Sequence, residues 1–377
     1  MTPPLMKAAR LHKVGGDFCV DEVETPTPGD DDVVVQVRSA NLVQNLRNVI
    51  STYPAEKPFL PLPELPAIFG MDIAGVISAT GRRVRNLRVG DRVYLSPGRA
   101  TADSWASRTG DPLSDPDFTF QGYFGFGPGS VETHRDYPHG GLCQYAKAPV
   151  SSVIAVPDNV SFDQASRFGY LGTSYAGLVK GQVRAGSTVM ILGATGTLGV
   201  GAVLLALAMG ATTILGVARN TALLERLRAL APNRIKVAAF GSVQIADWAR
   251  EHTGGLGVDV CLDALSHTAT ADVSMAGIWA LRRGGAFVSI GAMPEALPLP
   301  IYRLMTLRLS VLTSLWFSVA EGEDIARMAG AGTLDLRHFE AQGFSLEQTG
   351  QALAAASERA GGFTSIIVHP NGTDPSL

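Results

Sequence analysis

The chain has 377 residues, of which 46% are hydrophobic, and carries a formal net charge of −3 at pH 7. This length favours two domains, and the hydrophobic content is sufficient for large buried cores. The weakly negative charge and the lack of a polybasic run argue against binding to nucleic acid or to a membrane surface.

The N-terminal residues, MTPPLMKAARLHK, contain no apolar segment of the kind found in secretory signals, so we expect a cytoplasmic protein. The three cysteines, Cys19, Cys143 and Cys261, lie far apart in the sequence. This spacing favours small buried hydrophobic side chains over a disulfide framework or a CxxC zinc cluster.

The first third of the chain is predicted to form a compact β domain. Residues 5–40 alternate short strand-like runs with turns, and AGVISATGRRVRNLRVGDRVYL continues this pattern. Residues 96–140 differ, because they are rich in Gly, Pro, Asp and aromatic residues and show little periodicity. We interpret them as a long excursion, which could be a lid, a partner surface or an ordered structural loop.

No charged residue occurs between Arg184 and Arg219, and this run is long enough to cross a bilayer. Its pattern instead favours a βαβ unit. STVMIL is typical of a buried strand, GATGTLG of a turn, VGAVLLALAMGA of a helix apolar on every face, and TTILGVA of a second strand. The N–H groups of such a turn and of the helix N-terminus bind anions, so we prefer a dinucleotide site to a membrane span.

The glycines of this turn are spaced Gly-x-x-Gly-x-x-Gly, with one residue more between the first two than in the usual dinucleotide fingerprint. The position between a predicted strand and a predicted helix makes the motif specific. The predicted cofactor-binding residues of the loop are Gly193, Ala194, Thr195, Gly196, Thr197, Leu198 and Gly199.

Arg219 and Asn220 occupy the place where NAD-binding folds usually carry an acidic residue for the adenosine ribose. A guanidinium group suits a 2′-phosphate by its charge and its planar fork, so we predict NADP(H) rather than NAD(H). The alternative is that Arg219 is a solvated residue at a helix cap and that Arg226 or Arg228 faces the adenosine, or nothing does.

From about Ser161 the chain alternates predicted helices and strands, among them the strands GVDVCLDAL, GGAFVSIGAM and LRLSVLTSLW. This alternation predicts a doubly wound parallel sheet, whose ligands bind beyond the carboxyl ends of the strands. The segment FSLEQTGQALAAASERAGGFTSIIV predicts an amphipathic helix followed by a strand.

The order of these parts resembles the medium-chain dehydrogenase/reductase family. The resemblance rests on GATGTLG, on FGMDIAGVI followed by VGDRV, on GGLCQYAKAP followed by VIAVPDNVSFDQAS, and on FSLEQTGQAL. It implies an α/β protein with a GroES-like catalytic β domain over residues 1–165, to which residues 323–377 return. A Rossmann dinucleotide-binding domain is implied over residues 166–322.

Many members of this family hold a catalytic zinc through Cys, His and a second Cys or an acidic residue. The corresponding positions here are Val43, or Leu42 if one residue is deleted, then Met71, and a position near Tyr170. None of these side chains binds Zn²⁺, and the 96–140 excursion lacks the cysteines of the family's structural zinc, so we predict no metal. We expect His134 and His139, five residues apart in the excursion, to be solvated.

Zinc-free members of the family are typically quinone oxidoreductases and reductases of conjugated carbon–carbon double bonds. Together with the cofactor preference predicted from Arg219, the resemblance therefore implies a zinc-independent, NADPH-dependent reductase of a small electrophilic molecule, either an activated alkene or a quinone. A zinc-free carbonyl reductase or alcohol dehydrogenase is the near alternative. A nucleotide-binding protein with little catalysis, whose long loop serves a partner, is the alternative of another class.

The candidate catalytic residues cluster in sequence around the lost ligand positions. Tyr53 matches a tyrosine of zinc-free quinone reductases, and interface packing is its alternative role. Gln44 and Asn45 are candidates to hydrogen-bond a carbonyl oxygen, with structural hydrogen bonds as the alternative. Tyr170 either donates from its phenol or packs in the core, and for Asp72 we expect a structural role.

The resemblance also places residues of the Rossmann part near the nicotinamide. These are Thr173, Ser174, Leu265, Ile290, Gly291 and Ala292. The strand LRLSVLTSLW is where family members often pair edge to edge, so we expect a homodimer.

Overall fold

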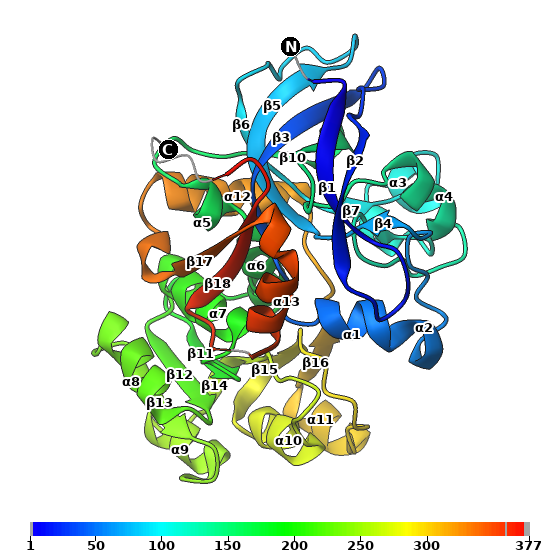
Figure 1. Cartoon of the computed structure of the whole chain (residues 1–377). Coiled ribbons are helices and arrows are strands. Elements are labelled where there is room, and N and C mark those ends of the chain that lie inside the picture. The colour runs from blue at the N-terminus through cyan, green and yellow to red at the C-terminus, as the bar shows by residue number, and fades with distance from the viewer. Residues whose placement is uncertain (1–2, 359, 373–377) are drawn as a thin grey trace.

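A computed structural model describes residues 3–358 and 360–372. It is an α/β protein in which a largely antiparallel β part lies beside a parallel sheet flanked by helices (Figure 1). The predicted fold class is confirmed. Residues 1–2, 359 and 373–377 of the predicted first domain lie outside the described part, and the predicted domain limits stay a prediction.

The β part contains a small sheet in the order β2-β1-β4 and a larger sheet in the order β10-β6-β5-β3-β18-β17, with β9 also paired to β3. The valines of VVVQV place β3 at the centre, where it is buried on both faces. The strand bounds are β1 Leu5–Leu11, β2 Phe18–Glu24, β3 Asp32–Asn41, β4 Ala67–Ile68, β5 Asp72–Thr80, β6 Arg92–Leu95, β9 Tyr145–Pro149, β10 Val153–Ala155, β17 Glu340–Ser345 and β18 Thr364–His369.

The excursion at residues 96–140 is an ordered lobe. Phe118, Phe120, Phe124 and Phe126 pack against one another, and Trp316 makes an edge-to-face contact with Phe120 at a centroid distance of 4.8 Å. The lobe thereby contacts the segment that leaves the parallel sheet. Its elements are β7 Gly98–Arg99, α3 Trp105–Arg108, β8 Thr119–Phe120 and α4 Ser130–Asp136, with a 3-10 turn at Pro112–Ser114.

The parallel sheet has the order β13-β12-β11-β14-β15-β16, which is the predicted doubly wound arrangement. Its strands are β11 Thr188–Leu192, β12 Thr213–Ala218, β13 Ile235–Ala239, β14 Val258–Asp263, β15 Leu281–Ser289 and β16 Ser310–Thr313. The associated helices are α6 Phe168–Lys180, α7 Thr197–Ala208, α8 Thr221–Leu230, α9 Ile245–Glu251, α10 Ala271–Trp279 and α11 Ile301–Leu307.

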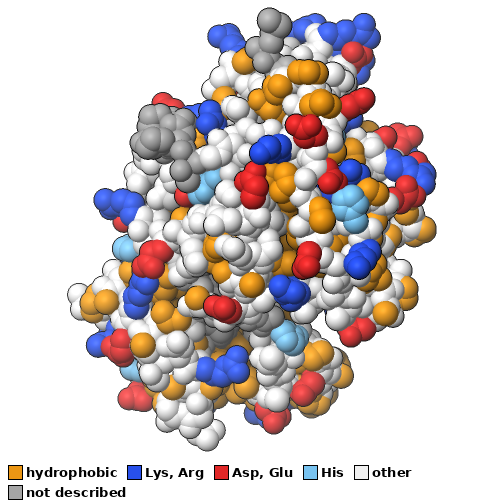
Figure 2. All heavy atoms as spheres, viewed as in Figure 1, with side chains coloured by type: hydrophobic (Ala, Val, Ile, Leu, Met, Phe, Trp, Pro, Cys, Tyr) orange, Lys and Arg blue, Asp and Glu red, His pale blue; other side chains and the backbone are white. Residues whose placement is uncertain are grey.

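The uncharged run forms β11, α7 and β12, as predicted. Helix α7 is apolar on all faces because it is buried in the core, where it packs against α6 and against the strands β11 and β12. Among residues 3–358 and 360–372, no helix combines the length and apolar character needed to cross a membrane. Acidic and basic side chains are interspersed over the face of the molecule seen in Figure 2.

The C-terminal part returns to the β part. After α12 (Val319–Gly330), β17 and β18 form a parallel pair, and β18 also pairs antiparallel with β3. The remaining helices are α1 Leu46–Ser51, α2 Tyr53–Glu56, α5 Phe162–Ala165 and α13 Thr349–Glu358, with 3-10 turns at Val150–Ser152, Leu336–His338 and Leu346–Gln348. This return places residues 360–362 against the glycine turn, because Gly362 N donates to Thr195 O at 2.8 Å.

A buried arginine joins these parts. Arg167, at the start of α6, is 1% exposed and donates to the Ser365 hydroxyl at 2.5 Å, to the Gly362 carbonyl and to the Thr197 carbonyl at 3.4 Å. Its guanidinium also stacks on the Phe339 ring at 3.9 Å. Burial lowers the pKa of Arg167 to about 10, so the group remains a cation at neutral pH.

Candidate active site

A cleft of about 540 Å³ opens beyond the carboxyl ends of β11, β12 and β14. This is the position expected for the ligand of a doubly wound sheet. Its lining includes Gln44 from the β part and the returning C-terminal segment. The residues are Gln44, Gly193, Thr195, Gly196, Thr197, Ala218, Arg219, Asn220, Leu223, Phe240, Ala264, Leu265, Ser266, Thr268, Ala269, Thr270, Val273, Ala360 and Gly361.

Glycine is required in the turn that lines this cleft. Gly193 has φ of +76°, and a Cβ there would lie 2.8 Å from the Ala264 carbonyl oxygen. A Cβ on Gly199 would lie 2.2 Å from the Gly193 carbonyl oxygen, so this glycine lets α7 begin close to β11. The first N–H groups of α7 have no partner within the helix and would be available to bind an anion.

The predicted loop residues therefore divide into two groups. Gly193, Thr195, Gly196 and Thr197 line the cleft. Ala194, Leu198 and Gly199 are outside its lining, and the Ala194 amide donates to the Val217 carbonyl at 3.1 Å. Ala194, Leu198 and Gly199 therefore support the shape of the turn without lining the cleft.

At the end of the cleft between β12 and α8, Arg219 and Asn220 make different contacts. The Asn220 side chain caps α8 by accepting a hydrogen bond from Leu223 N at 3.0 Å. The Arg219 side chain is exposed and reaches Thr268 Oγ1 at 3.5 Å. Among the described residues that line the cleft, Arg219 is the one charged side chain, and no Asp or Glu is present.

The alternative arginines are engaged elsewhere. Arg226 pairs with Glu340 at 2.7 Å and stacks on Phe363 at 3.9 Å, while Arg228 pairs with Glu225 at 2.6 Å. Neither lines the cleft. The alternative that one of these two faces the adenosine is therefore not supported by their contacts.

The structure brings together the three positions that, by the family resemblance, correspond to zinc ligands. The backbone N–H of Gln44, next to Val43, donates to the Tyr170 hydroxyl at 3.1 Å. Asp72, next to Met71, accepts from the backbone N–H of Gly169, which precedes Tyr170. The spatial cluster supports the positional correspondence that the sequence suggested. Leu42 and Met71 are buried apolar side chains, and neither offers the thiolate or imidazole that typically binds zinc.

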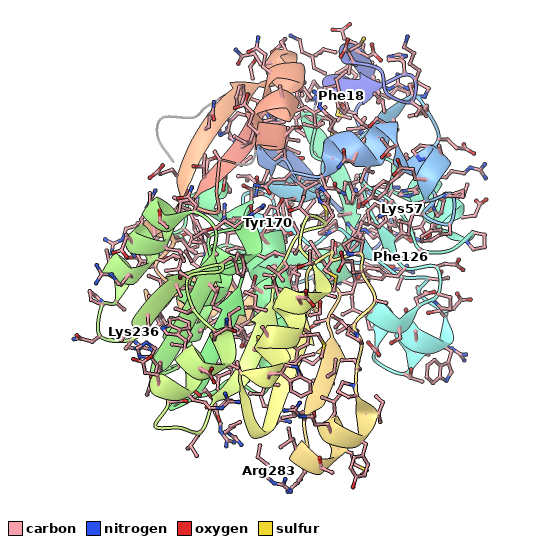
Figure 3. The ribbon with its side chains drawn as sticks, turned by 90° about the horizontal axis from the view of Figure 1, so that it is seen from below. Phe18, Lys57, Phe126, Tyr170, Lys236 and Arg283 are labelled. Atoms are coloured by element: carbon pink, nitrogen blue, oxygen red, sulfur yellow. The ribbon has the colours of Figure 1, made fainter. Side chains whose placement is uncertain are left out.

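Phenol groups take up this region instead. Asn45 Nδ2 donates to the Tyr53 hydroxyl at 2.8 Å, and Tyr170 approaches from α6. Figure 3 shows Tyr170 where the ribbon of the parallel-sheet part meets the β part. Because Gln44 both lines the cleft and binds Tyr170, the phenols adjoin the end of the cleft nearest the β part.

Sequence reasoning missed Tyr123, which the lobe brings to the same place. Its ring lies 4.6 Å from that of Phe124, which also contacts Tyr53 at 6.0 Å. Burial raises the pKa of Tyr123 well above its usual value, and a hydrogen bond from Asn45 opposes this shift. The aromatic run QGYFGFG was the one available signal, because such a run lies in an otherwise polar loop.

Asp72 lies beneath the phenols and is fully buried. The Tyr94 hydroxyl donates to its Oδ1 at 2.7 Å. Burial raises the pKa of Asp72 from 3.8 to about 7, although the bonds from Tyr94 and Gly169 and the charge of Arg167 act in the opposite direction. These contacts agree with the structural role expected for this residue.

Two hydroxyl groups predicted to approach the nicotinamide donate hydrogen bonds to backbone carbonyls of the protein. Thr173 Oγ1 donates to the Gly169 carbonyl at 3.0 Å, and Ser174 Oγ, which is fully buried, donates to the Leu198 carbonyl at 2.9 Å. Ser174 thereby fixes α6 against the first turn of α7. Its contacts give it a packing role and leave its hydroxyl outside the cleft lining.

The turn after β15 is also bonded internally. The N–H groups of Ile290 and Gly291 donate to the Asp263 carbonyl at 2.9 and 3.1 Å, and Ala292 N donates to Leu265 O at 3.0 Å. A Cβ on Gly291 would lie 2.2 Å from Leu265 O, so glycine allows the two turns to touch. Since these N–H groups are already bonded, the carbonyl groups of the turn are the backbone atoms that could hydrogen-bond the carboxamide of a nicotinamide.

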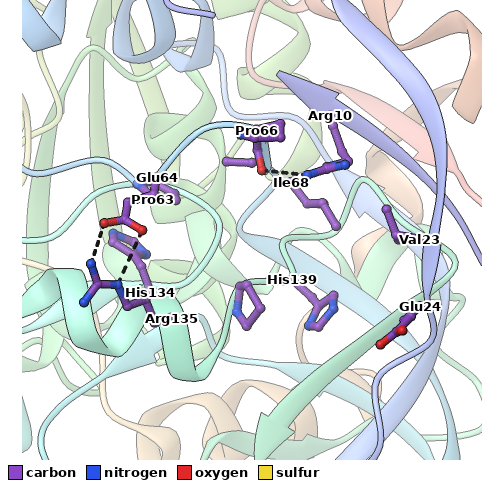
Figure 4. A pocket seen from close by; sticks show the side chains of 12 residues that line it. Arg10, Val23, Glu24, Pro63, Glu64, Pro66, Ile68, His134, Arg135 and His139 are labelled. Atoms are coloured by element: carbon purple, nitrogen blue, oxygen red, sulfur yellow. Dashed lines mark hydrogen bonds and ion pairs between the residues drawn. The ribbon is translucent and has the colours of Figure 1, made fainter. Parts of the chain in front are cut away.

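The expectation that His134 and His139 are solvated is wrong for His134, which is 4% exposed, while His139 is half-buried. Both line a separate cavity of about 280 Å³ between β1, β2 and the lobe (Figure 4). Burial lowers the pKa of each to about 4, so both rings are neutral at pH 7. Within residues 3–358 and 360–372, no group of three or more His, Cys, Asp or Glu side chains is arranged to hold a metal ion.

The raised pKa of Asp72 predicts a pH-dependent stability difference between the wild type and Asp72→Asn. The folded-state pKa is about 7 and the unfolded value is 3.8, so the stabilising contribution is complete below 3.8 and is lost as the pH rises to about 7. The variant retains an oxygen for Tyr94 and does not titrate. The free energy of unfolding of the variant, relative to that of the wild type, should increase by up to roughly 4 kcal/mol across this range. Urea denaturation at both ends of the range measures the gain, and a constant difference would contradict the buried, titrating carboxyl.

Comparison with known proteins identifies the family. A model of the alcohol dehydrogenase GroES-like domain matches residues 29–158, and a model of the zinc-binding dehydrogenase family matches residues 197–330. Sorbitol dehydrogenase of Bacillus subtilis (strain 168) is 26% identical over 378 residues, covering 98% of both chains. Alcohol dehydrogenase of Geobacillus stearothermophilus is 28% identical over 332 residues, covering 87% of this chain and 90% of its own.

Solved structures show the same fold over the full chain. The crystal structure of AibC superposes with a TM-score of 0.82 at 22% identity and covers 98% of this chain and 97% of its own. A putative zinc-binding dehydrogenase from Sinorhizobium meliloti 1021, bound to NADP, has a TM-score of 0.81 at 21% identity and covers 98% of this chain and 100% of its own. With the two family models in the order of its β part and its parallel sheet, the chain belongs to the medium-chain dehydrogenase/reductase superfamily of oxidoreductases.

Proposed function

We propose that the protein is a zinc-independent, NADPH-dependent reductase that transfers a hydride to an activated alkene or a quinone. The observation that carries this proposal is the replacement of all three zinc-ligand positions by Val43, Met71 and Tyr170, beside phenol groups that adjoin the cofactor cleft. Hydrogen-bond donors of this kind stabilise a developing oxyanion where a metal is not available.

The residues of the cleft fit a nicotinamide dinucleotide. The glycine turn and the start of α7 would hold the pyrophosphate, and Arg219 would hold a 2′-phosphate. When bound, the reduced cofactor supplies the hydride. NADP, the dinucleotide that carries a 2′-phosphate, is also the ligand named for the Sinorhizobium meliloti structure.

The side chains of this protein would act on the substrate oxygen. As the hydride adds to the β-carbon of an enone, the electron pair of the double bond moves to the oxygen, which becomes an enolate. Tyr53 is the first candidate to donate a hydrogen bond to it, because it combines partial exposure with a fixed hydroxyl position. Water supplies the proton to the α-carbon. Removing one such donor typically lowers turnover by about 10²- to 10³-fold.

A second candidate function is reduction of a carbonyl group or oxidation of an alcohol without zinc. It is favoured by the names of the relatives, which are sorbitol and alcohol dehydrogenases. In that case the oxygen held by the phenols would accept or lose a full proton. A protein that binds NADP and catalyses little is a third candidate.

The first experiment is oxidation of NADPH by chelator-treated protein with a cyclic enone, a quinone and an aromatic aldehyde in parallel. We expect turnover of the enone or the quinone, unchanged by added zinc, because the phenols stabilise the oxyanion. Turnover of the aldehyde alone would favour the carbonyl reductase. Dependence on zinc, or stoichiometric zinc in the purified protein, would contradict the proposal, and tight NADPH binding without turnover would favour the third candidate.

The preference for NADPH is tested at Arg219. We expect Arg219→Ala to raise the Kd of NADPH about tenfold to a hundredfold, because one charge-assisted contact contributes about 1.5–3 kcal/mol. The Kd of NADH should not change. Arg228→Ala is the matched control, since Arg228 pairs with Glu225 outside the cleft. Equal Kd values of the two cofactors for the wild type would contradict the preference.

We also propose a homodimer formed through β16, the edge strand of the parallel sheet. Exposed apolar side chains gather beside this edge, namely Ile301 (69% exposed), Tyr302 (77%), Met305 (63%) and Leu315 (55%). Light scattering should give the mass of two chains for the wild type, and Tyr302→Glu should shift the population towards one chain. A monomeric wild type at micromolar concentration would rule the dimer out.

A further inference from the structure

We propose that Thr268 donates a hydrogen bond to the 2′-phosphate of NADPH beside Arg219, and that Ser266 is the positioning residue that directs the Thr268 hydroxyl. This inference rests on the proposed function, since it concerns the phosphate that distinguishes NADPH from NADH. It gives two hydroxyl groups of the loop between β14 and α10 a role that the sequence pattern did not indicate.

The three side chains come from two strand ends. Arg219 directly follows β12, and Ser266 and Thr268 follow β14. In the sheet, β11 lies between these two strands and continues into the glycine turn. Since neighbouring strands are about 5 Å apart, the two strand ends lie roughly 10 Å apart, one on each side of the turn. All three residues line the cofactor cleft.

The Arg219 side chain reaches across this distance. Its Nη2 donates to Thr268 Oγ1 at 3.5 Å, and Thr268 Oγ1 lies 3.0 Å from Ser266 Oγ. The guanidinium and the two hydroxyls therefore form a continuous row of polar groups along the cleft wall. The contact at 3.5 Å is longer than the usual N–H···O distance of about 2.7–3.2 Å, so a stronger acceptor can replace it.

The positive charge in this row has no carboxylate beside it in the cleft. Among the described residues that line the cleft there is no Asp or Glu. The nearby basic residues Arg226 and Arg228 differ, because each of them pairs with a glutamate. A guanidinium that lines a cleft without an acidic neighbour favours an anion as its ligand.

A phosphate monoester matches these donors. It offers three acceptor oxygens and carries close to two negative charges at pH 7. The planar fork of Arg219 can donate to two of the oxygens, and a hydroxyl can rotate its hydrogen towards a third acceptor. Since Thr268 Oγ1 already lies within 3.5 Å of Nη2, a phosphate oxygen that binds Nη2 is also within reach of the Thr268 hydroxyl.

The Ser266 hydroxyl completes this arrangement. When Thr268 gives its hydrogen to the phosphate, its oxygen is free to accept, and Ser266 Oγ lies at the right distance to donate to it. Ser266 then directs the Thr268 hydrogen away from itself and towards the ligand. NADH has a neutral hydroxyl in place of the phosphate, so the same donors gain much less from it.

The first test is calorimetry of the full chain with adenosine 2′,5′-bisphosphate and with AMP, which lacks the 2′-phosphate. We expect Thr268→Val to raise the Kd of the bisphosphate about threefold to tenfold, because it removes a donor to a charged group. The Kd of AMP should not change. An equal rise for both ligands would mean that the hydroxyl contacts the nucleoside, and would overturn the proposal.

The matched control for this change is Thr212→Val. Thr212 precedes β12 at the end of the strand opposite to the cleft, where its hydroxyl donates to the Gly186 carbonyl at 3.1 Å. This variant should bind both ligands as the wild type does. Thr268→Ser keeps a hydroxyl and should retain most of the affinity for the bisphosphate.

The second test separates direct contact from support of Arg219. In the Arg219→Ala variant, Thr268→Val should still raise the Kd of the bisphosphate, because the hydroxyl touches the phosphate itself. Loss of the effect in that variant would mean that Thr268 acts only through the arginine, and would contradict the contact.

The positioning role of Ser266 is tested in the same way. Ser266→Ala should raise the Kd of the bisphosphate less than Thr268→Val does, and should have no further effect in the Thr268→Val variant. An additive effect would show that Ser266 contacts the ligand directly, which contradicts its positioning role.

The ionisation of the bound phosphate gives a further readout. The second pKa of a free phosphate monoester is about 6. Phosphorus NMR of the bound bisphosphate should show a lower pKa for the 2′-phosphate, because the guanidinium and the hydroxyl favour the dianion. We expect a smaller decrease with Thr268→Val, and an equal decrease would count against the contact. The unfolding temperature of every variant checks that the fold is retained.

The outcomes distinguish this inference from the proposed function. If the wild type prefers the bisphosphate and Thr268→Val matches it in both assays, the hydroxyl contact is wrong and the proposed function stands. If Thr268→Val weakens the bisphosphate alone but the wild type reduces neither enone nor quinone, the phosphate site stands and the proposed reductase fails. Equal affinity of the wild type for the bisphosphate and AMP would overturn the phosphate site.

Discussion

The cofactor cleft depends on one buried cation, Arg167. This side chain binds the first turn of α7, the returning segment at Gly362 and the start of β18 at Ser365. These segments are far apart in the chain, and the guanidinium donates a hydrogen bond to an oxygen of each. Because a buried carbonyl without a hydrogen bond costs about 1–3 kcal/mol, the guanidinium makes close packing of the three segments possible.

This packing has consequences for the site on both sides of Arg167. On one side, Gly362 N bonds to Thr195 O, so the C-terminal return forms part of the wall of the cleft. On the other side, the positive charge acts on Asp72, which is buried below the phenols and bonded to Tyr94. Arg167 therefore contacts the wall of the cleft directly and acts on the carboxyl group beneath the phenols through its charge.

The proposed function would give a common fold a different chemistry. The relatives are dehydrogenases of sorbitol and other alcohols, and one matching family model is that of a zinc-binding dehydrogenase. Here the positions that cluster around Gln44 and Gly169 carry apolar and phenol side chains. Under the proposed function, the scaffold would position its reacting groups in the same place, and different residues would stabilise the oxyanion.

Local patterns in the sequence were sufficient for the βαβ unit, the doubly wound sheet, the glycine turn and the unusual Arg219. Each of these depends on residues close together in the chain, whose periodicity or conformational needs are visible without a structure. The buried state of His134, the internal bonds of Thr173 and Ser174, and the positions of Tyr123 and Arg167 were not visible. They depend on contacts between residues separated by tens to hundreds of positions, such as Arg167 with Ser365. Sequence alone thus determined the class of fold and the nucleotide-binding turn, whereas only the tertiary structure decided which polar groups are consumed by packing and which are left to face a substrate.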